Sequence, residues 1–405
     1  MAAGAQDVEQ ASGELEIAKR KFMRRWSSKQ WIAVLLICVV CTGLLSQGNL
    51  IYLARITNRV PVLPPLDSYI GKRPVAIPFS AIFDLPRLER ELRMDIVEWK
   101  DVKYSQSEEV DVLGCWGVFQ VADLHTSGPR FSRNAMDLKL DLSYTKAPAS
   151  VKLIPGFEHD SHSSFWSLAP LAFSDLRAKA LASMDVETLP GPWTGAIALP
   201  DEQMVCYDYL FYVCADVPAE FERDVYPAWE VVQKHFRWTI AVERVGQEYL
   251  RRVLNVSSDA VVPPHITIHA RHGDFKDWCN EYDPQACFAS LATFAKRVAE
   301  LKDELRTTKG IQVEHVIMTS DEQDAAWWDQ VREMGWLSID HDKEGTTERH
   351  GEWYPVIVDA YVQSAGIGFV GTDRSTFSTI ARLRVRDWNG GAVRMVKWGK
   401  PDADD

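Results

Sequence analysis

The sequence predicts a protein of mixed α/β class with two domains and an N-terminal transmembrane helix. Three features predict this fold: a charge-free apolar run near the N-terminus, a Pro-rich mixture of short strands and turns in the middle, and a regular alternation of strands and helices toward the C-terminus. The chain has 405 residues, of which 46% are hydrophobic, and this is enough for two sizeable cores. Its net charge of -12 argues against a nucleic-acid partner, because a phosphate backbone is held by clustered Lys and Arg.

The N-terminal segment is predicted to anchor the protein in a membrane. Residues 1–30 are polar and charged for most of their length, and we expect them to form a cytoplasmic tail. The run that follows, Trp31–Leu53, is long enough to cross a thin bilayer and is expected to be an uncleaved signal anchor. Basic residues before the run predict a single-pass type II membrane protein of the Golgi or endoplasmic reticulum, with everything after the anchor in the lumen. These basic residues are Lys19, Arg20, Lys21, Arg24, Arg25 and Lys29.

Two alternatives stay open for the apolar run. A cleaved signal peptide has a similar apolar core, although the charged region before this one is long and no Ala-x-Ala site follows it. A buried parallel strand over Ala33–Val40 would also be continuously apolar, since both faces of such a strand are covered.

The cysteines and one sequence motif also indicate the lumen. Five cysteines follow the apolar run, and the pairs Cys206 with Cys214 and Cys279 with Cys287 are each separated by a short loop that can close a disulfide. Cys115 is then left over. Asn255-Val256-Ser257 is an acceptor sequence for N-glycosylation, a modification of exposed luminal segments.

The rest of the chain divides into two predicted domains. An irregular α/β domain is expected over 54–245, where strands and turns alternate with Pro-rich joints. A continuous helix is expected over Trp229–Val253, where apolar residues recur at three- and four-residue spacing, and it is expected to bridge the two halves.

A regular α/β domain is predicted over 246–405. Its expected strands are Ile266–Ala270, Val313–Thr319, Ile367–Val370 and Val393–Trp398. The expected helices between and beside them are Phe288–Leu305, a segment through Trp327 and Met334, Tyr354–Ser364 and Phe377–Val385. Strands separated by helices predict a parallel sheet with right-handed crossovers, whose ligand site lies outside the carboxyl ends of the strands.

The first predicted strand of this domain runs directly into the motif His269-Ala270-Arg271-His272-Gly273-Asp274. A guanidinium at the carboxyl end of a parallel strand can bind a pyrophosphate with a planar pair of hydrogen bonds, so Arg271 is the leading candidate for a phosphate ligand. Gly273 allows the backbone to approach the ligand closely. The structural alternative is a salt bridge from Arg271 to Asp274 or Asp277.

Two further features are candidates for the same site. The run from Gly371 to Ser378 follows an apolar strand and opens a helix, whose free N–H groups and dipole suit an anion; the simpler interpretation is a helix cap by Ser375 or Thr376. Asp359 lies inside an apolar helical stretch, where a carboxylate needs donors, and guanine offers two of them from N1 and the exocyclic amine. The alternative is that Asp359 is a solvated or capping residue.

This combination resembles the GDP-fucose fucosyltransferase superfamily, which includes protein O-fucosyltransferases and α1,6-fucosyltransferases, and specifically its fungal membrane-anchored members. The resemblance extends over roughly Ile77 to Trp398. His269, Arg271, Asp359 and the Ser375-Thr376-Phe377-Ser378 run match the three motifs of the superfamily in order and approximate spacing, and Pro78 to Asp84 is similar to its N-terminal segment.

The resemblance implies a metal-independent GT-B fold of two Rossmann-like domains, with the acceptor on the N-terminal domain and the donor on the C-terminal one. It implies transfer of fucose from GDP-fucose to a protein or glycan hydroxyl, with inversion at the anomeric carbon and no cofactor. Arg271 would hold the β-phosphate and act in catalysis, and His269 and Asp359 would hold the guanosine. Ser375, Thr376 and Phe377 would hold the diphosphate, and Asp274 is the nearest carboxylate that could act as a base.

Two alternative functions remain. The superfamily carries a Gly-x-x-Asn-Gln loop that faces the donor sugar, and its nearest match here, Gly43 to Gln47, has Ser46 in place of Asn and lies inside the predicted anchor. The protein would then be an inactive donor-binding or scaffolding relative. Asp340-His341-Asp342 instead resembles the Asp-x-Asp metal site of GT-A transferases, in which Asp340 and Asp342 would bind a divalent ion.

Overall fold

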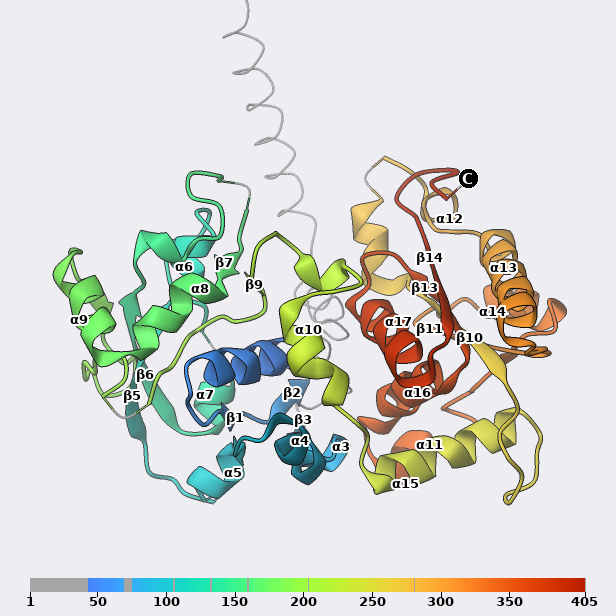
Figure 1. The fold of residues 1–405 in the computed structure, drawn as a ribbon, viewed down its shortest axis with the longest axis horizontal. Helices are drawn as coiled ribbons and strands as arrows, with labels where there is room; N and C mark the ends of the chain where they lie inside the picture. The colour runs from blue at the N-terminus through green and yellow to red at the C-terminus, as the bar shows by residue number, and fades with distance from the viewer. Residues whose placement is uncertain are drawn as a thin grey trace, which may run out of the picture.

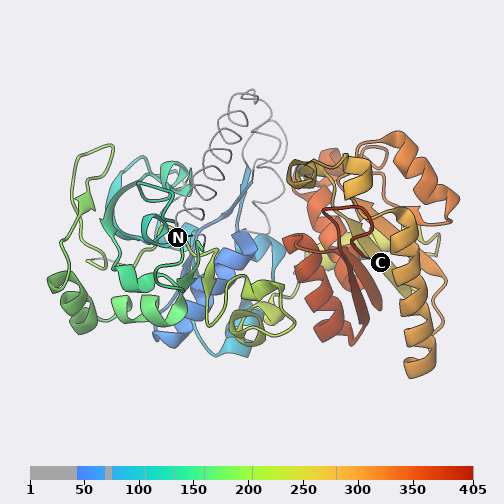
Figure 2. The ribbon, with the colours of Figure 1, turned by 90° about the horizontal axis from the view of Figure 1, so that it is seen from above.

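Two lobes of mixed α/β structure lie side by side (Figures 1 and 2). The structure is a computed structural model that describes residues 43–404, except 69–74 and the single residues 105, 132, 159, 203 and 280. The N-terminal lobe is drawn in blue to green and the C-terminal lobe in orange to red, with the yellow-green helix α10 (Pro227–Val231) between them.

The C-terminal lobe is built on one parallel sheet, as the sequence predicts, and it has a fifth strand, β12, beside the four that were expected. Its strand order is β12-β11-β10-β13-β14. The strands are β10 (His265–Ala270), β11 (His315–Ser320), β12 (Leu337–Ser338), β13 (Gly368–Thr372) and β14 (Ala392–Val396). The chain moves outward from β10 to β11 and β12 and then crosses back to β13 on the other side of β10. The direction of winding therefore reverses between β10 and β13, which is where open α/β sheets bind their ligands.

Helices cover both faces of this sheet. On one face lie α13 (Leu291–Lys309) and α14 (Ala325–Glu333), whose buried residues pack against the apolar side chains of β10 and β11. On the other face lie α16 (Tyr354–Ala365) and α17 (Thr376–Asn389). Because side chains alternate along β10, Ile268 and Ala270 enter the core under α13, while His269 points to the opposite face, toward α17.

The predicted bridging helix is wrong as a single element. It is divided into α10, a 3-10 turn at Gln233–His235, and α11 (Ile240–Val253). The side chain of Thr239 accepts a hydrogen bond from the N–H of Val242 at 3.3 Å and caps α11, so a new helix begins there. Helix α11 packs on α16, and the predicted domain boundary at 245 and 246 falls inside it.

The strands of the N-terminal lobe are divided among small sheets. They pair as β1 (Val62–Leu63) with β4 (Val97–Glu98), β2 (Leu66–Ser68) with β3 (Val75–Ile77), β5 (Asp111–Gly117) with β6 (Leu140–Lys146) and β8 (Thr188–Leu189), and β7 (Ser163–Ser164) with β9 (Val213–Cys214). Within the described part of this lobe no single sheet of the predicted Rossmann type forms. Pro64 and Pro65 end β1 after two residues, because proline has no N–H for a ladder.

Short helices fill the remainder of both lobes. They are α3 (Phe79–Ile82), α4 (Leu85–Leu92), α5 (Trp99–Val102), α6 (Phe119–Ala122), α7 (Arg133–Asp137), α8 (Phe165–Leu168), α9 (Ser174–Ala182), α12 (Pro284–Cys287) and α15 (Thr346–His350). Helix α4 begins where the Asp84 carboxylate accepts from the N–H of Arg87 at 3.0 Å.

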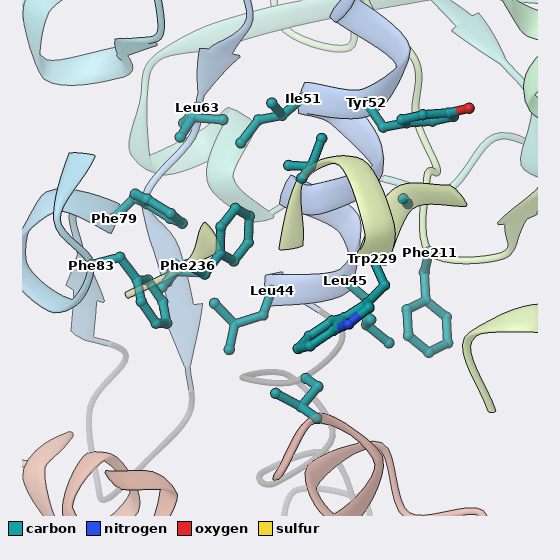
Figure 3. Packing of buried hydrophobic residues seen from close by; sticks show 14 of the residues in the cluster. Leu44, Leu45, Ile51, Tyr52, Leu63, Phe79, Phe83, Phe211, Trp229 and Phe236 are labelled. Carbon is teal, nitrogen blue, oxygen red and sulfur yellow. The ribbon is translucent and has the colours of Figure 1, made fainter. Parts of the chain in front are cut away.

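The second half of the predicted membrane anchor is part of the N-terminal core. Residues 43–56 are helical, and Leu44, Leu45 and Ile51 are buried with Phe79 and Trp229 (Figure 3). A membrane span over Trp31–Leu53 is therefore wrong for residues 43–53, because an apolar run looks alike in a core helix and in a bilayer. No helix within residues 43–404 as described is long and apolar enough to cross a membrane.

Other predictions for the N-terminus lie outside the described residues. These are the cytoplasmic tail at 1–30, the first part of the anchor at 31–42, and the alternative strand Ala33–Val40.

The helix at 43–56 is also fixed by two buried amides. Gln47 donates from Nε2 to the carbonyl of Pro64 at 2.7 Å, and Asn49 donates from Nδ2 to the carbonyl of Leu210 at 2.8 Å.

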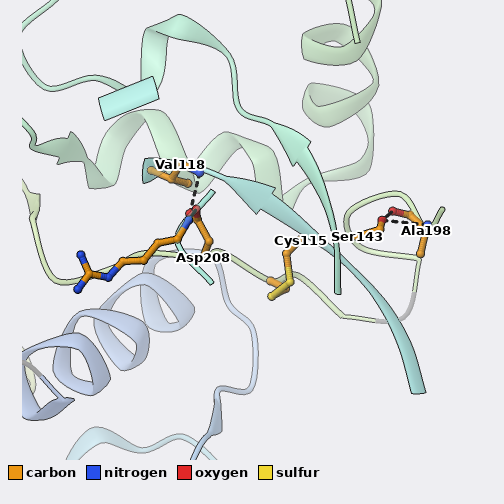
Figure 4. The surroundings of a disulfide bond; sticks show 7 residues. Cys115, Val118, Ser143, Ala198 and Asp208 are labelled. Atoms are coloured by element: carbon orange, nitrogen blue, oxygen red, sulfur yellow. Dashed lines mark hydrogen bonds between the residues drawn. A yellow bond between two sulfur atoms is a disulfide. The ribbon is translucent and has the colours of Figure 1, made fainter. Parts of the chain in front are cut away.

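Two disulfides connect the cysteines, and one of them differs from the prediction. Cys279 is bonded to Cys287, as predicted from their spacing. Cys206 is bonded to Cys115 (Figure 4). It is not bonded to Cys214, which is buried and free in β9. The N–H of Trp116 donates to the carbonyl of Cys206 at 2.8 Å, so the segment around Cys206 runs alongside β5 and brings the two sulfurs together.

Candidate active site

The predicted site residues meet at the carboxyl edge of the C-terminal sheet. His269 and Arg271 lie at the end of β10, Thr372 ends the neighbouring β13, and α17 begins just after it. The N–H of Arg271 donates to Oγ1 of Thr372 at 3.0 Å, and this hydroxyl donates to the carbonyl of His269 at 3.0 Å. Thr372 thus joins the two strand ends at the point where the winding of the sheet reverses.

Arg271 is buried between two carboxylates. Its Nη2 is 2.6 Å from Oδ1 of Asp274, and its Nη1 is 2.9 Å from Oδ2 of Asp321, while the Arg271 side chain is 5% exposed. The salt bridge to Asp274 that the sequence offers as an alternative is therefore present, and Asp277 is not one of these two partners. Asp321 is a site residue that the sequence reading missed. Its position could have indicated this role, because Asp321 directly follows β11 at the same edge of the sheet.

Asp274 differs from an ordinary surface acid. Burial raises the pKa of Asp274, the positive charge of Arg271 opposes this rise, and the nearby charge of Asp321 adds to it. Asp274 therefore holds its proton more readily than a free aspartate does.

His269 lies against the start of α17 in a closed environment. Its Nδ1 is 2.7 Å from Oγ of Ser378, and its ring meets the ring of Phe377 edge-on at 5.1 Å. Burial lowers the pKa of His269 to about 3, with smaller contributions from the positive charges of Arg271 and His272. The imidazole is therefore neutral at physiological pH, and it adds a hydrogen-bonding group to the site without adding charge.

His272 points to the other side of the strand. Its ring stacks on Phe288 at 4.4 Å with an interplanar angle of 6°, and its Nδ1 is 2.7 Å from Oε2 of Glu322. Of the two basic side chains that follow β10, Arg271 faces the candidate site and His272 packs beneath α14.

The start of α17 combines a cap with a potential anion site. Oγ of Ser375 accepts from the N–H of Ser378 at 3.4 Å, so the capping role that the sequence offers as the simpler interpretation is present. Arg374 takes a left-handed conformation with φ of 64°, which turns the chain from β13 into the helix. As in any α-helix, the first N–H groups, including those of Thr376 and Phe377, have no intrahelical acceptor, and α17 begins just after the carboxyl end of β13.

Asp359 lies on α16 and has a partner within the chain. Its Oδ1 is 3.0 Å from Nε2 of His341, whose Nδ1 is 3.0 Å from Oγ1 of Thr346. Burial acts to lower the pKa of His341, but the charge and hydrogen bond of Asp359, with the charges of Asp340 and Asp342, outweigh burial, and the pKa is raised. Asp359 is therefore paired with His341 and is separate from the contacts around Arg271.

The Asp340-His341-Asp342 motif forms a turn. The carboxylate of Asp340 accepts from the N–H of Lys343 at 3.0 Å, while His341 is directed at Asp359. In the part of the chain that the structure describes, no three His, Cys, Asp or Glu side chains are grouped as metal ligands.

The two lobes meet at a small apolar cavity of about 30 Å³, which reaches Phe377 at the start of α17. Leu44 and Leu66 line this cavity from the N-terminal lobe, and Ala360 and Phe377 line it from the C-terminal lobe. The sequence match to a sugar-facing loop, Gly43 to Gln47, is helical in the structure, and its Leu44 faces this cavity.

Comparison with known proteins identifies the family and a similar fold. The family model for GDP-fucose protein O-fucosyltransferase matches residues 47–386. The fold is similar to that of POFUT1 in complex with GDP-fucose, with a TM-score of 0.52, 14% identity, and coverage of 88% of this chain and 93% of that chain. It is also similar to POFUT1 in complex with GDP, with a TM-score of 0.51, 15% identity, and coverage of 86% and 93%. No match was found among curated proteins.

The arrangement of the lobes is accordingly GT-B-like, and the similarity gives no support to a GT-A order of elements. The family match spans most of the chain and includes His269, Arg271, Asp359 and the start of α17. The predicted resemblance is confirmed, and the chain belongs to the GDP-fucose protein O-fucosyltransferase family of enzymes.

Proposed function

We propose that the protein transfers fucose from GDP-fucose to a hydroxyl group of a protein or glycan, with inversion at the anomeric carbon. The observation that carries the proposal is the position of Arg271, which lies next to the start of α17 at the switch point of the sheet. Membership of the family and a fold shared with POFUT1 bound to GDP-fucose support the same donor.

Arg271 and α17 supply the charge that the donor needs. In this proposal the pyrophosphate binds to the remaining N–H groups of Arg271 and to the first turn of α17, at Ser375, Thr376 and Phe377. Negative charge grows on the departing GDP as the glycosidic bond breaks, so donors that strengthen with this charge lower the barrier. A guanidinium and a helix N-terminus take the place of a metal ion here.

In this proposal His269 and Asp359 bind the guanosine. A carboxylate has room for several hydrogen bonds, so Asp359 accepts from N1 and the exocyclic amine of guanine while His341 keeps its contact. Uracil does not present this pair of adjacent donors, and Asp359 therefore favours GDP over UDP.

The position of Asp274 favours a role in orienting Arg271 over a role in deprotonating the acceptor. Its Oδ1 lies 2.6 Å from the guanidinium, and its side chain is only 11% exposed. We therefore assign Asp274 to orienting Arg271, instead of to the general-base role that its sequence position suggests.

The covalent features of the chain support a luminal location. The two disulfides, Cys115–Cys206 and Cys279–Cys287, are typical of an oxidising compartment, and Asn255 of the glycosylation sequence is exposed after α11. We propose that the described part of the chain works in the lumen of the endoplasmic reticulum or Golgi.

Titration of the purified protein with GDP-fucose, GDP-mannose and UDP-sugars tests the proposal, together with donor hydrolysis and transfer assays. We expect GDP-fucose to bind and to be turned over. A second function, donor binding without transfer, is favoured by one observation: Gly43 to Gln47 is helical and has Ser46 where the family loop has Asn. GDP-fucose binding without turnover would support that function, and preferential binding of UDP-sugars would refute both.

A further inference from the structure

Asp321 contacts the candidate site from the end of a neighbouring strand. It is the first residue after β11, next to β10 in the sheet. Its Oδ2 is 2.9 Å from Nη1 of Arg271, and its Oδ1 accepts from the backbone N–H of His272 at 2.8 Å. One carboxylate thus fixes both the side chain of Arg271 and the backbone that follows it.

Gly273 leaves the space that Asp321 occupies. A Cβ atom added to Gly273 would lie 2.3 Å from Oδ2 of Asp321 and 3.1 Å from its Cγ. Both distances are shorter than normal contacts, so any larger residue would push the carboxylate away from Arg271. The glycine of the motif is therefore required by Asp321 within the protein itself, in addition to any close approach by a ligand.

The charges make displacement of these carboxylates unfavourable. Arg271, Asp274 and Asp321 carry a formal net charge of about −1 together, and none of their side chains is more than 11% exposed. An anionic pyrophosphate that replaced both carboxylates would leave two buried charges without a partner. A guanidinium has five N–H groups, so the ligand instead binds those that the carboxylates leave free.

The two carboxylates hold Arg271 in different ways. Asp274 is only three residues further along the same turn, so it moves with Arg271. Asp321 comes from β11 and fixes the guanidinium relative to the sheet, and therefore relative to the start of α17. Resting on the proposed function, we propose that Asp321 is a positioning residue of the donor site, which aims the free N–H groups of Arg271 at the pyrophosphate of GDP-fucose.

Asp321→Asn separates charge from shape. Asparagine keeps the size of the side chain and an oxygen for the N–H of His272, but it loses the charge that orients Arg271. We expect kcat to fall about a hundredfold, as for a small misplacement of a reacting group. The dissociation constant of GDP-fucose should change little, since the loss of a competing negative charge offsets the poorer orientation.

Glu322→Gln is the matched control. It removes the same charge from the next residue at the same edge of the sheet, but Glu322 contacts His272 and not Arg271. We expect the kcat of this variant to remain close to that of the wild type. A purely structural role for Asp321 would instead lower thermal stability in Asp321→Asn and leave the kcat of the folded variant unchanged.

Gly273→Ala provides an independent test through coupling. In the wild-type background the added methyl group displaces Asp321, so kcat should fall as it does in Asp321→Asn. In an Asp321→Ala background the methyl group meets no carboxylate, and we expect no further loss. Hydrogen exchange supplies a readout without turnover: the N–H of His272 should be protected in the wild type and in Asp321→Asn, and exposed in Asp321→Ala.

The outcomes distinguish this inference from the proposed function. A wild-type protein that neither binds nor turns over GDP-fucose would refute the proposed function. A wild type that turns over the donor refutes the role of Asp321 if Asp321→Asn retains full kcat, or if Gly273→Ala is equally harmful with Asp or Ala at position 321.

Discussion

Asp359 on α16 and His341 in the turn before α15 are hydrogen-bonded, with Oδ1 and Nε2 3.0 Å apart. The pair connects Asp359, the predicted ligand for guanine, with His341, the central residue of the Asp-x-Asp motif. In the structure His341 contacts Asp359 through Nε2. Its Nδ1 contacts the hydroxyl of Thr346, which accepts a hydrogen bond from the hydroxyl of Tyr249.

Asp359→Ala should weaken GDP binding and reduce the preference for GDP over UDP. A hydrogen bond to the guanine edge is present before and during bond cleavage, so donor affinity should fall by about 1 to 3 kcal/mol while kcat at saturation changes little. Calorimetric titration with GDP and UDP measures both effects. His341→Gln is the control, because it removes the partner and keeps the carboxylate; if Asp359→Ala leaves the GDP preference intact, Asp359 is structural.

The same pair predicts how stability depends on pH. The folded state raises the pKa of His341, because burial, which lowers it, is outweighed by the charge and hydrogen bond of Asp359 together with the charges of Asp340 and Asp342. The stabilisation is therefore fully present below the unfolded-state pKa of histidine and is lost as pH rises through the higher folded-state value. Urea unfolding at several pH values should show this decline in the wild type and a weaker one in Asp359→Asn. Equal slopes in the two proteins would contradict the assignment.

Chelation should leave the activity unchanged. In this account Arg271 and α17 meet the charge of the donor, so EDTA should alter neither GDP-fucose binding nor its turnover. The assay compares treated and untreated protein, with manganese added back to each. Loss of activity on chelation and recovery with manganese would instead favour Asp340 and Asp342 as metal ligands.

Asn255 should carry an N-linked glycan when the protein is made in a eukaryotic secretory pathway. The residue is exposed and follows α11, and Ser257 completes the acceptor sequence. Endoglycosidase treatment should increase gel mobility, and Ser257→Ala should abolish the shift. Ser257→Thr is the matched control because it keeps the acceptor sequence. An unglycosylated protein that protease reaches from the cytosol would rule out the luminal topology.

The C-terminal half was predictable because its signals are local. Apart from the two-residue β12, the strands there are mostly apolar runs. Arg271 directly follows β10, and Ser375 lies three residues after β13. In the N-terminal half several strands have only two residues, so they carry no period that a sequence can reveal.

Other features depend on which segments the fold brings together. Cys115 and Cys206 are 91 residues apart and become neighbours only beside β5. The contacts of Asp321 with Arg271 and of His341 with Asp359 join different strands and helices in the same way. Residues 43–53 show the opposite problem, because an apolar pattern alone does not distinguish a buried helix from a membrane span.

The kinetics of Arg271→Lys test the central claim most directly. Lysine keeps the positive charge but loses the planar pair of donors, and it cannot contact Asp274, Asp321 and a pyrophosphate in the same geometry. The lost stabilisation grows with charge on the leaving GDP, so the activation free energy should rise by about 3 kcal/mol and turnover should fall roughly a hundredfold. The dissociation constant of GDP-fucose should change much less. Arg306→Lys, on an exposed residue of α13, should behave as the wild type. Full turnover in Arg271→Lys would contradict the assignment of Arg271 to the pyrophosphate and the transferase mechanism built on it.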